Sequence, residues 1–316
     1  MLTGSVLLLF PVVAFVASFV FWPGLLIKAY NWFWRRRLGM TVRFSHVGGA
    51  PSLLLLHGFS ANKDMWLPVV QPSNLLKINI NSLDAGNNES LIRFKVFLCL
   101  QFVHSVGLKH FHLIGTSMGG NLAGVYAARF PQDLCSVSLV CPAGLEPPED
   151  TEFVKRLREM EVQKQQNQDL SAESIALIPT TVPQLQDMLD LCCHKPLKLP
   201  RQMMKGLLQN RLPTTPSTDT VMFECISTEG SRHSLQENLG HITVPVQVVW
   251  GQQDQVLHVS GASVIAAALP HSQVALLDDC GHSVALERPR KLASVICSFL
   301  STQEVTNGDV EKKKSC

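Results

Sequence analysis

Ser117 lies in the segment Gly115-Thr116-Ser117-Met118-Gly119, a G-x-S-x-G pattern between two segments of different structural preference. The apolar run at 111–114 is typical of a buried strand, and the small residues at 120–128 are typical of a closely packed helix. A serine on a sharp strand-to-helix turn exposes its hydroxyl, and glycines are needed where neighbouring backbone leaves no room for a Cβ. The pattern therefore predicts that Ser117 is a nucleophile.

A serine hydroxyl needs a general base, and that base needs a carboxylate to orient it. The C-terminal third of the chain supplies both, in the order Ser, Asp, His that accompanies this type of turn. Asp254 follows an apolar, strand-like run at 244–250, and His282 follows another at 273–277. Because the carboxyl ends of parallel strands meet at one edge of a sheet, we expect Ser117, Asp254 and His282 to meet there.

Three other carboxylates lie near the predicted base in the sequence: Asp278, Asp279 and Glu287. They flank His282 too closely to approach its ring from the side opposite the serine. We therefore predict that Asp254 orients His282 and stabilises its imidazolium form.

Hydrolysis also needs donors for the oxyanion of the tetrahedral intermediate, each contributing about 3–4 kcal/mol. One is the backbone N–H of the residue after the nucleophile, Met118. The other is expected after an earlier strand, and the run at 52–56 is followed by His57-Gly58-Phe59-Ser60. We predict that the Phe59 N–H is the second donor and that His57 has a structural role.

These segments predict an α/β-hydrolase fold, with a mostly parallel central sheet flanked by helices, a helical lid and one N-terminal transmembrane helix. The predicted divisions are an anchor with its aromatic and basic flank at 1–38, a first core part at 39–145, a lid at 146–231, a second core part at 232–303 and a disordered tail at 304–316. Amphipathic patterns in the lid fit either helices packed on the core or helices that line an acyl pocket and face a bilayer.

The N-terminus predicts a membrane anchor. Residues 6–27 are almost wholly apolar, and at about 1.5 Å per residue they cross a hydrocarbon core of ~30 Å. Basic residues follow this segment, at Lys28 and 35–37, and none precedes it. The excess of positive charge on that side predicts a hydrolase domain facing the cytoplasm. Four aromatic residues are expected to form an interfacial belt: Trp22, Tyr30, Trp32 and Trp34.

The composition excludes several other classes of protein. A net charge of +2 gives no indication of nucleic-acid binding. Nine cysteines at scattered positions form neither a C-x-x-C pattern nor a metal-type pairing with histidine. We expect no metal and no organic cofactor, because a Ser-His-Asp set performs the whole reaction. The sequence indicates no particular protein partner.

Five stretches resemble the membrane-anchored monoacylglycerol lipases of the α/β-hydrolase domain-containing protein 6 type. They are HGFSANKDMW (57–66), HLIGTSMGGNLAGVYAA (112–128), LVCPAGL (139–145), VVWGQQDQVLHVSGA (248–262) and LLDDCGHSVALERPRK (276–291). The resemblance implies hydrolysis of monoacylglycerols, including 2-arachidonoylglycerol, and of lysophospholipid-type substrates. It also implies a late endosomal or lysosomal membrane. The residues alone indicate only a serine hydrolase, and a C–C bond hydrolase shares the same triad.

The segment 78–95 departs from the pattern of related hydrolases. A strand stub at 78–80 is expected, but an asparagine-rich stretch replaces the usual glycine turn after it, and 41–49 has room for one strand only. Asparagines in a buried central strand are costly without partners, so we predict that 78–95 is poorly ordered and lowers stability. This departure supports an alternative function, a catalytically impaired membrane protein that acts as a protein or lipid binding scaffold.

Overall fold

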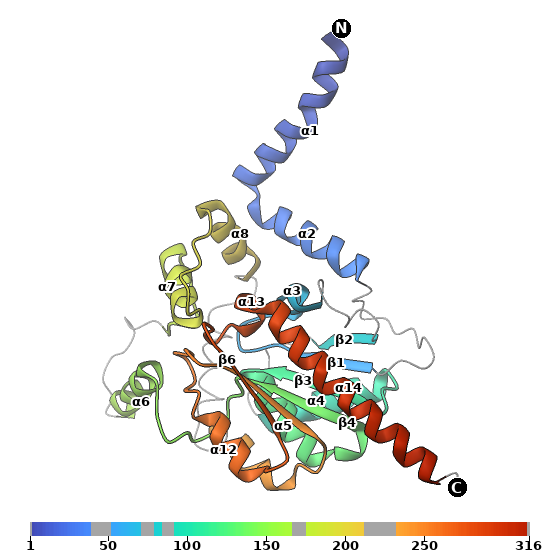
Figure 1. The fold of residues 1–316 in the computed structure, drawn as a ribbon. Coiled ribbons are helices and arrows are strands. Elements are labelled where there is room, and N and C mark those ends of the chain that lie inside the picture. Colours follow the sequence, from blue (N-terminus) through green and yellow to red (C-terminus); the bar gives the residue numbers. More distant parts are fainter. Residues whose placement is uncertain are drawn as a thin grey trace.

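The computed structural model describes residues 2–38, 52–70, 79–83, 92–165, 175–211 and 232–314 (Figure 1). Within these ranges all neighbouring strands are parallel and form one sheet in the order β2-β1-β3-β4-β5-β6. The strands are β1 (Ser52–Leu56), β2 (Asn79–Leu83), β3 (Phe111–Thr116), β4 (Leu134–Val140), β5 (Val246–Gly251) and β6 (Gln273–Leu277). The strand order reverses between β1 and β3, and such a switch point is where ligands bind in sheets of this type.

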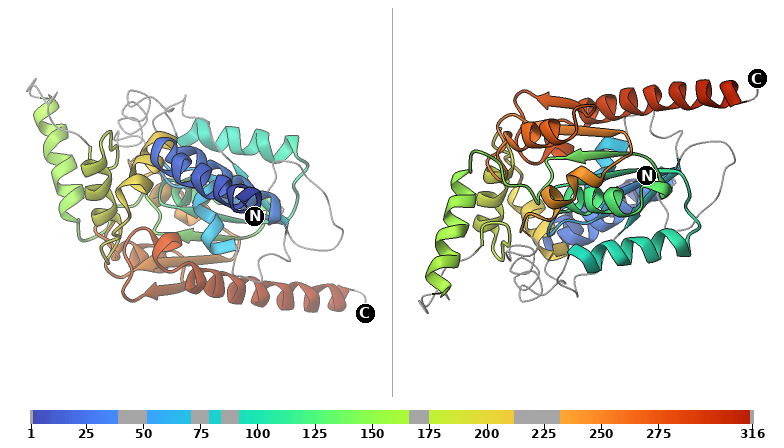
Figure 2. Two further views of the ribbon diagram at one scale, coloured as in Figure 1. Left: turned by 90° about the horizontal axis from the view of Figure 1, so that it is seen from above. Right: turned by 90° about the horizontal axis from the view of Figure 1, so that it is seen from below.

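Helices cover both faces of the sheet, and Figure 2 shows α4 and α14 on opposite sides of it. The helices after the N-terminal pair are η1 (Lys63–Trp66), α3 (Leu67–Val70), α4 (Ile92–Ser105), α5 (Met118–Arg129), η3 (Pro131–Asp133), α6 (Glu152–Gln165), α7 (Val182–Cys192), α8 (Arg201–Arg211), α11 (Ser234–Asn238), η4 (Leu239–His241), α12 (Gly261–Ala268), α13 (Val284–Glu287) and α14 (Pro289–Lys314). The prediction of an α/β-hydrolase fold with a parallel sheet flanked by helices is confirmed.

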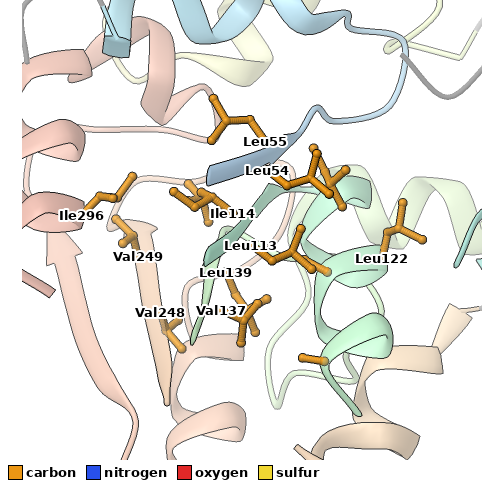
Figure 3. Packing of buried hydrophobic residues seen from close by; sticks show 14 of the residues in the cluster. Leu54, Leu55, Leu113, Ile114, Leu122, Val137, Leu139, Val248, Val249 and Ile296 are labelled. Carbon is orange, nitrogen blue, oxygen red and sulfur yellow. The ribbon is translucent and has the colours of Figure 1, made fainter. Parts of the chain in front are cut away.

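The central strands are apolar because both of their faces are covered. Every residue of β1, β3 and β5 is buried, which explains why these strands are mostly apolar in sequence, although a few polar residues such as His112 and Gln247 are buried with them. Figure 3 shows Leu54, Leu113 and Leu139 together on one face of the sheet and Val249 on the opposite face, near Ile296. This rigid layer fixes where the loops at the strand ends begin.

Strand β2 lies in the segment 78–95, where a stub at 78–80 was expected. It runs from Asn79 to Leu83 and pairs with β1 along its whole length, from Ser52–Asn79 to Leu56–Leu83. Among the described strands β2 lies at one edge of the sheet, beside β1. The rest of the asparagine-rich stretch, 84–91, lies outside the described residues, as does 41–49.

The N-terminal segment differs from the single helix predicted. It forms α1 (Leu2–Phe21) and α2 (Pro23–Arg37), which are bent by 113° where they meet. Among the described residues no single helix is long and apolar enough to cross a membrane, and only the bent pair meets the length and composition required. Pro23 explains the break, because proline disfavours helical backbone in the residue before it, and Trp22 has φ −133° and ψ 56°.

The C-terminal end also differs from the prediction. Disorder was expected from 304, but the backbone of α14 is helical to Lys314. Several residues of this end, glutamate and lysine among them, have high helix propensity and extend a helix that is already anchored by its buried first half.

His112 gives the fold a testable dependence on pH. It is buried between β3 and β4, with its Nδ1 2.7 Å from Ser136 Oγ, and burial lowers the pKa of His112 to about 4. The unfolded chain, with a histidine pKa of about 6.5, takes up the proton first. We therefore expect the free energy of unfolding to fall by about 2–3 kcal/mol between pH 7 and pH 4.5, as measured by urea unfolding in detergent.

A matched pair of variants isolates this contribution. His112→Leu removes the titrating group and is expected to reduce the pH dependence, whereas His271→Gln, at an exposed position, is expected to retain it. An unchanged pH dependence in His112→Leu would contradict the assignment.

Candidate active site

Ser117 has the strained backbone of a nucleophile on a tight turn. Its φ of 55° and ψ of −120° are unusual for a residue with a side chain. The surrounding backbone holds it there, because the Ser117 N–H donates to the Val140 carbonyl at 2.9 Å and its own carbonyl accepts from Ala143 at 3.0 Å. These bonds tie the turn between β3 and α5 to the end of β4.

The glycines on either side of Ser117 are required by close backbone contacts. A Cβ on Gly115 would lie 2.0 Å from the Gly119 carbonyl oxygen, and one on Gly119 would lie 2.5 Å from the His57 carbonyl oxygen. No side chain fits at either distance. Helix α5 therefore begins directly against the end of β1.

The loop after β1 passes beside the nucleophile. A Cβ on Gly58 would lie 3.2 Å from Ser117 Cβ, so the chain from His57 to Ser60 borders the serine. The His57 ring Nδ1 donates to the Gly58 carbonyl at 2.8 Å, a contact that stabilises this loop. Phe59 packs its side chain against the core.

Met118 is the first residue of α5. Its N–H therefore belongs to the first four of the helix, which have no acceptor within the helix itself. The positive end of the helix dipole also lies here, beside Ser117, and favours negative charge. Both the free N–H and the helix dipole would stabilise an oxyanion that forms next to Ser117.

Asp254 and His282 are joined at the ends of β5 and β6. Asp254 Oδ2 accepts from His282 Nδ1 at 2.7 Å and from Trp250 Nε1 at 3.2 Å. Its Oδ1 accepts from the N–H groups of Val256 at 2.8 Å and Leu257 at 2.9 Å. The side chain of Asp254 is fully buried, and these four donors compensate for the lost hydration of the carboxylate.

This bond sets the tautomer of His282. An ionised carboxylate only accepts hydrogen bonds, so the proton between the two groups belongs to Nδ1 of the ring. Nε2 is then left as the acceptor in the neutral ring. Among the described residues, no hydrogen bond joins Ser117 to His282. Both side chains are partly exposed at the same sheet edge.

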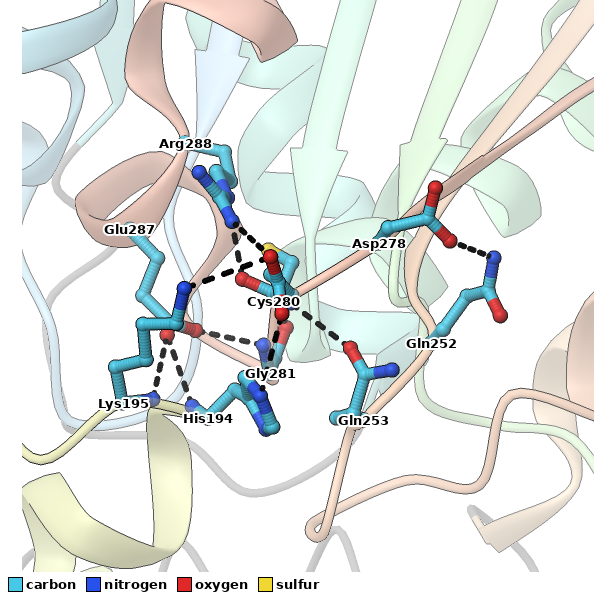
Figure 4. Close-up of polar contacts among 10 residues, drawn as sticks. His194, Lys195, Gln252, Gln253, Asp278, Cys280, Gly281, Glu287 and Arg288 are labelled. Carbon is cyan, nitrogen blue, oxygen red and sulfur yellow. Dashed lines mark hydrogen bonds and ion pairs between the residues drawn. The ribbon is translucent and has the colours of Figure 1, made fainter.

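The three alternative carboxylates are engaged elsewhere (Figure 4). Glu287 accepts from the backbone N–H groups of Gly281 at 2.6 Å and His194 at 2.8 Å. Asp279 forms ion pairs with Lys195 and Arg288, both at 3.4 Å. The remaining one, Asp278, accepts from Gln252 at 2.5 Å. These contacts hold the loop that carries His282, and none of the three reaches the ring of His282.

Two residues near the pair were missed by the sequence analysis. Trp250 donates to Asp254, and Cys141 lies at the end of β4. Cys141 Sγ, an Asp254 oxygen and a His282 nitrogen all lie within 4.8 Å of one another. Burial and the nearby Asp254 charge raise the pKa of the Cys141 thiol well above its usual value, so it is a poor metal ligand as it stands. In the sequence, only their positions at the ends of predicted strands could have indicated that Trp250 and Cys141 lie near the site.

Helices of the predicted lid region contact both loops of the site. The Cys192 carbonyl at the end of α7 accepts from the Ser283 N–H at 2.8 Å, next to His282. At the end of α8, Arg211 donates to Ser60 Oγ and to the Leu177 carbonyl. The α7–α8 segment is therefore connected to the histidine loop on one side and to the Gly58–Ser60 loop on the other.

The fold and the arrangement of Ser117, Asp254 and His282 define the α/β-hydrolase class. The chain belongs to this family: the family described as alpha/beta hydrolase fold matches residues 51–289. The chain is 46% identical to rat (Rattus norvegicus) monoacylglycerol lipase ABHD6, over 96% of this chain and 94% of that protein. It is 45% identical to the human (Homo sapiens) protein of the same name, with the same coverage. The resemblance to the monoacylglycerol lipases is thus confirmed.

Solved structures agree on the fold. A membrane phospholipase A, described as a bacterial virulence factor, is 27% identical with a TM-score of 0.77, over 96% of this chain and 98% of that one. The meta-cleavage product hydrolase of Pseudomonas fluorescens IP01 is 15% identical with a TM-score of 0.64, over 81% of this chain and 92% of that one. The second comparison shows the common fold alone.

The close packing at Gly119 is testable. We expect Gly119→Ala to lower the free energy of unfolding by at least about 2 kcal/mol, because the new Cβ would clash with the backbone at the end of β1. Gly240→Ala is the matched control, since a Cβ there meets nothing within 4 Å. Thermal unfolding of both variants checks this, and equal stability of the two would contradict the packing described.

Proposed function

We propose that this protein is a membrane-bound serine hydrolase that cleaves the ester bond of monoacylglycerols through an acyl-serine intermediate. One observation carries the proposal: the hydrogen bond between Asp254 and His282, at the sheet edge where the Ser117 turn also lies. The names of the relatives support the substrate class.

In the proposed first step, His282 Nε2 takes the proton of Ser117 as Oγ attacks the ester carbonyl carbon. Asp254 stabilises the imidazolium that forms, since it already accepts from Nδ1. The carbonyl oxygen becomes an oxyanion, and the N–H groups of Phe59 and Met118 are its proposed donors.

Collapse of this intermediate breaks the bond to the glycerol oxygen, which takes the proton from His282 and leaves. Water then loses a proton to His282 and attacks the acyl carbon, and the second tetrahedral intermediate releases the fatty acid as Ser117 regains its proton. The chain's own residues perform every proton transfer in this sequence.

We further propose that the substrates include 2-arachidonoylglycerol and lysophospholipids. The support is the sequence resemblance around Ser117, Asp254 and His282. The segment 146–231, proposed as the lid, carries an exposed methionine on α8, Met203, and a flexible thioether side chain suits acyl chains of varying shape.

The bent pair α1–α2 is the proposed membrane attachment. Lys28 and the basic residues at the end of α2 favour a hydrolase domain on the cytoplasmic side, and the resemblance supports a late endosomal or lysosomal membrane. Attachment raises the local concentration of lipid substrates that dissolve poorly in water.

Variants at the carboxylates test the mechanism. We expect Asp254→Asn to lower kcat for a monoacylglycerol by roughly 10³–10⁴, because an amide no longer favours the required tautomer of His282. The matched control is Asp279→Asn, which removes an exposed carboxylate of the loop that carries His282 and is expected to keep kcat within about threefold. The measurement is fatty-acid release in detergent micelles.

The scaffold alternative predicts a different result. If the protein is catalytically impaired, the wild type, Asp254→Asn and Asp279→Asn would all release no fatty acid, although each would still bind lipid. Equal activity of Asp254→Asn and the wild type would assign the orienting role to another residue.

A further inference from the structure

Helix α2 has two faces of opposite character. Along the exposed face, residues recur every three or four positions, and they are apolar, aromatic or basic. It consists of Leu25, Lys28, Ala29, Trp32, Phe33 and Arg36, together with Trp22 just before the helix, and the exposed Tyr30 and Arg37 border it. Trp32 and Phe33 are 56% and 48% exposed in the described part of the chain, so about half of each of these large side chains is open to solvent.

The opposite face of α2 is docked onto the protein. Pro23 and Gly24 are buried, and a Cβ on Gly206 of α8 would lie 2.9 Å from the Pro23 backbone. Further along, Trp34 packs against the core and Arg35 forms an ion pair with Asp64 at 3.1 Å. The exposed stripe of α2 therefore faces away from the hydrolase.

Side chains of α8 compensate for the backbone bond that the bend breaks. In a continuous helix the Gly24 N–H would donate to the Val20 carbonyl, four residues earlier. Instead the Gly24 N–H donates to Gln209 Oε1 at 3.2 Å, and the Val20 carbonyl accepts from Gln202 Nε2 at 2.8 Å. Two glutamines of one helix thus bind both halves of the broken pair, which identifies the bend as a specified feature of the fold.

The bend also has the angle that a membrane surface requires. A change of direction of 113° places α2 about 23° from a right angle to α1. A helix α1 that entered a bilayer along its normal would leave α2 nearly parallel to the surface (Figure 1). Helices with an aromatic and apolar face and basic residues lie in the interface in this way.

The charges on α2 indicate which lipids it meets. Lys28, Arg36 and Arg37 form no ion pair among the described residues, and the two arginines lie over the rings of Trp32 and Trp34 at 5.7 and 5.8 Å. Arg35, in contrast, is neutralised by Asp64. Three cations without an ion pair in the described part of the chain, two of which lie over tryptophan rings, match a layer of anionic headgroups.

From these observations we infer that the exposed face of α2 binds the headgroup region of an anionic bilayer and lies flat in it. This inference rests on the membrane attachment included in the proposed function. It assigns α2, most of which lies beyond the span of 6–27 expected from the sequence, to the membrane surface, and α8 holds that helix at the bend.

The docked face connects this surface helix to the candidate active site. Asn31 and Arg35 of α2 both bind Asp64, at 2.8 and 3.1 Å, just after the loop that carries Phe59. Helix α8 reaches the same loop through Arg211 and Ser60. A bilayer that binds α2 would therefore lie at a fixed position relative to the oxyanion loop.

Quenching of tryptophan fluorescence tests the inference without any need for catalysis. The full-length protein is placed in nanodiscs whose lipids carry bromine near the headgroup or deep in the acyl chain. We expect shallow bromines to quench more strongly than deep ones. Replacing phosphatidylcholine in part by phosphatidylserine is expected to increase the shallow quenching, since each cation shifts the docking equilibrium about fivefold.

Matched variants assign the signal to α2. Trp22→Phe with Trp32→Phe is expected to abolish the shallow quenching, while Trp34→Phe, on the docked face, is expected to retain it. The triple variant Lys28→Gln, Arg36→Gln, Arg37→Gln is expected to show no increase in shallow quenching when phosphatidylserine is added.

Three results would overturn the inference. Stronger quenching by deep bromines would show that α2 continues a transmembrane span. No quenching would show that α2 faces water, and no quenching together with a chemical cross-link between two copies would assign the face to self-association. Hydrolysis is measured separately on the same samples, so an inactive enzyme with shallow quenching would contradict the proposed catalysis and leave this inference standing.

Discussion

The buried carboxylate of Asp254 is the constraint on which the site depends. A carboxylate without water is costly unless donors surround it, and here the four donors come from β5, from the loop after it and from His282. The loop must fold closely around Asp254 to supply two of these bonds, and the ring of His282 must turn its Nδ1 toward it. The Asp254–His282 pair is therefore fixed by the folded chain itself, and in the proposed reaction no binding energy is needed to orient it.

The parallel sheet turns this local arrangement into a site. Because β1 and β3 are neighbours and leave the sheet at the same edge, the loop of Phe59 and the turn of Ser117 lie side by side at the switch point of the strand order. Close backbone contacts at Gly115 and Gly119 leave room only for hydrogen at those positions. Helices α7 and α8 then connect to the two loops from outside the sheet, through Cys192 and Arg211.

Local sequence was sufficient to predict the strands at 52–56, 111–114 and 273–277 and the fold they define, since apolar runs next to glycine turns have few alternatives. The catalytic roles of Ser117, Asp254 and His282 stay predictions, although the bond between the last two agrees with them. The bend at Trp22 was not predicted, because the partners that stabilise it, Gln202 and Gln209, lie far away in the sequence. The position of β2 depends on the order of strands, and Trp250 became visible as a partner of Asp254 only in the folded chain.

Labelling with a fluorophosphonate, followed by mass spectrometry of the labelled peptide, shows directly whether Ser117 is an activated nucleophile. The reagent reacts with a serine only when a base activates it and donors stabilise the oxyanion. We predict a single adduct, on Ser117. Asp254→Asn is expected to lose most of the labelling, and Asp279→Asn is expected to be labelled like the wild type. A folded protein that is not labelled, or that is labelled on another serine, would contradict the claim that Ser117, Asp254 and His282 form the active site.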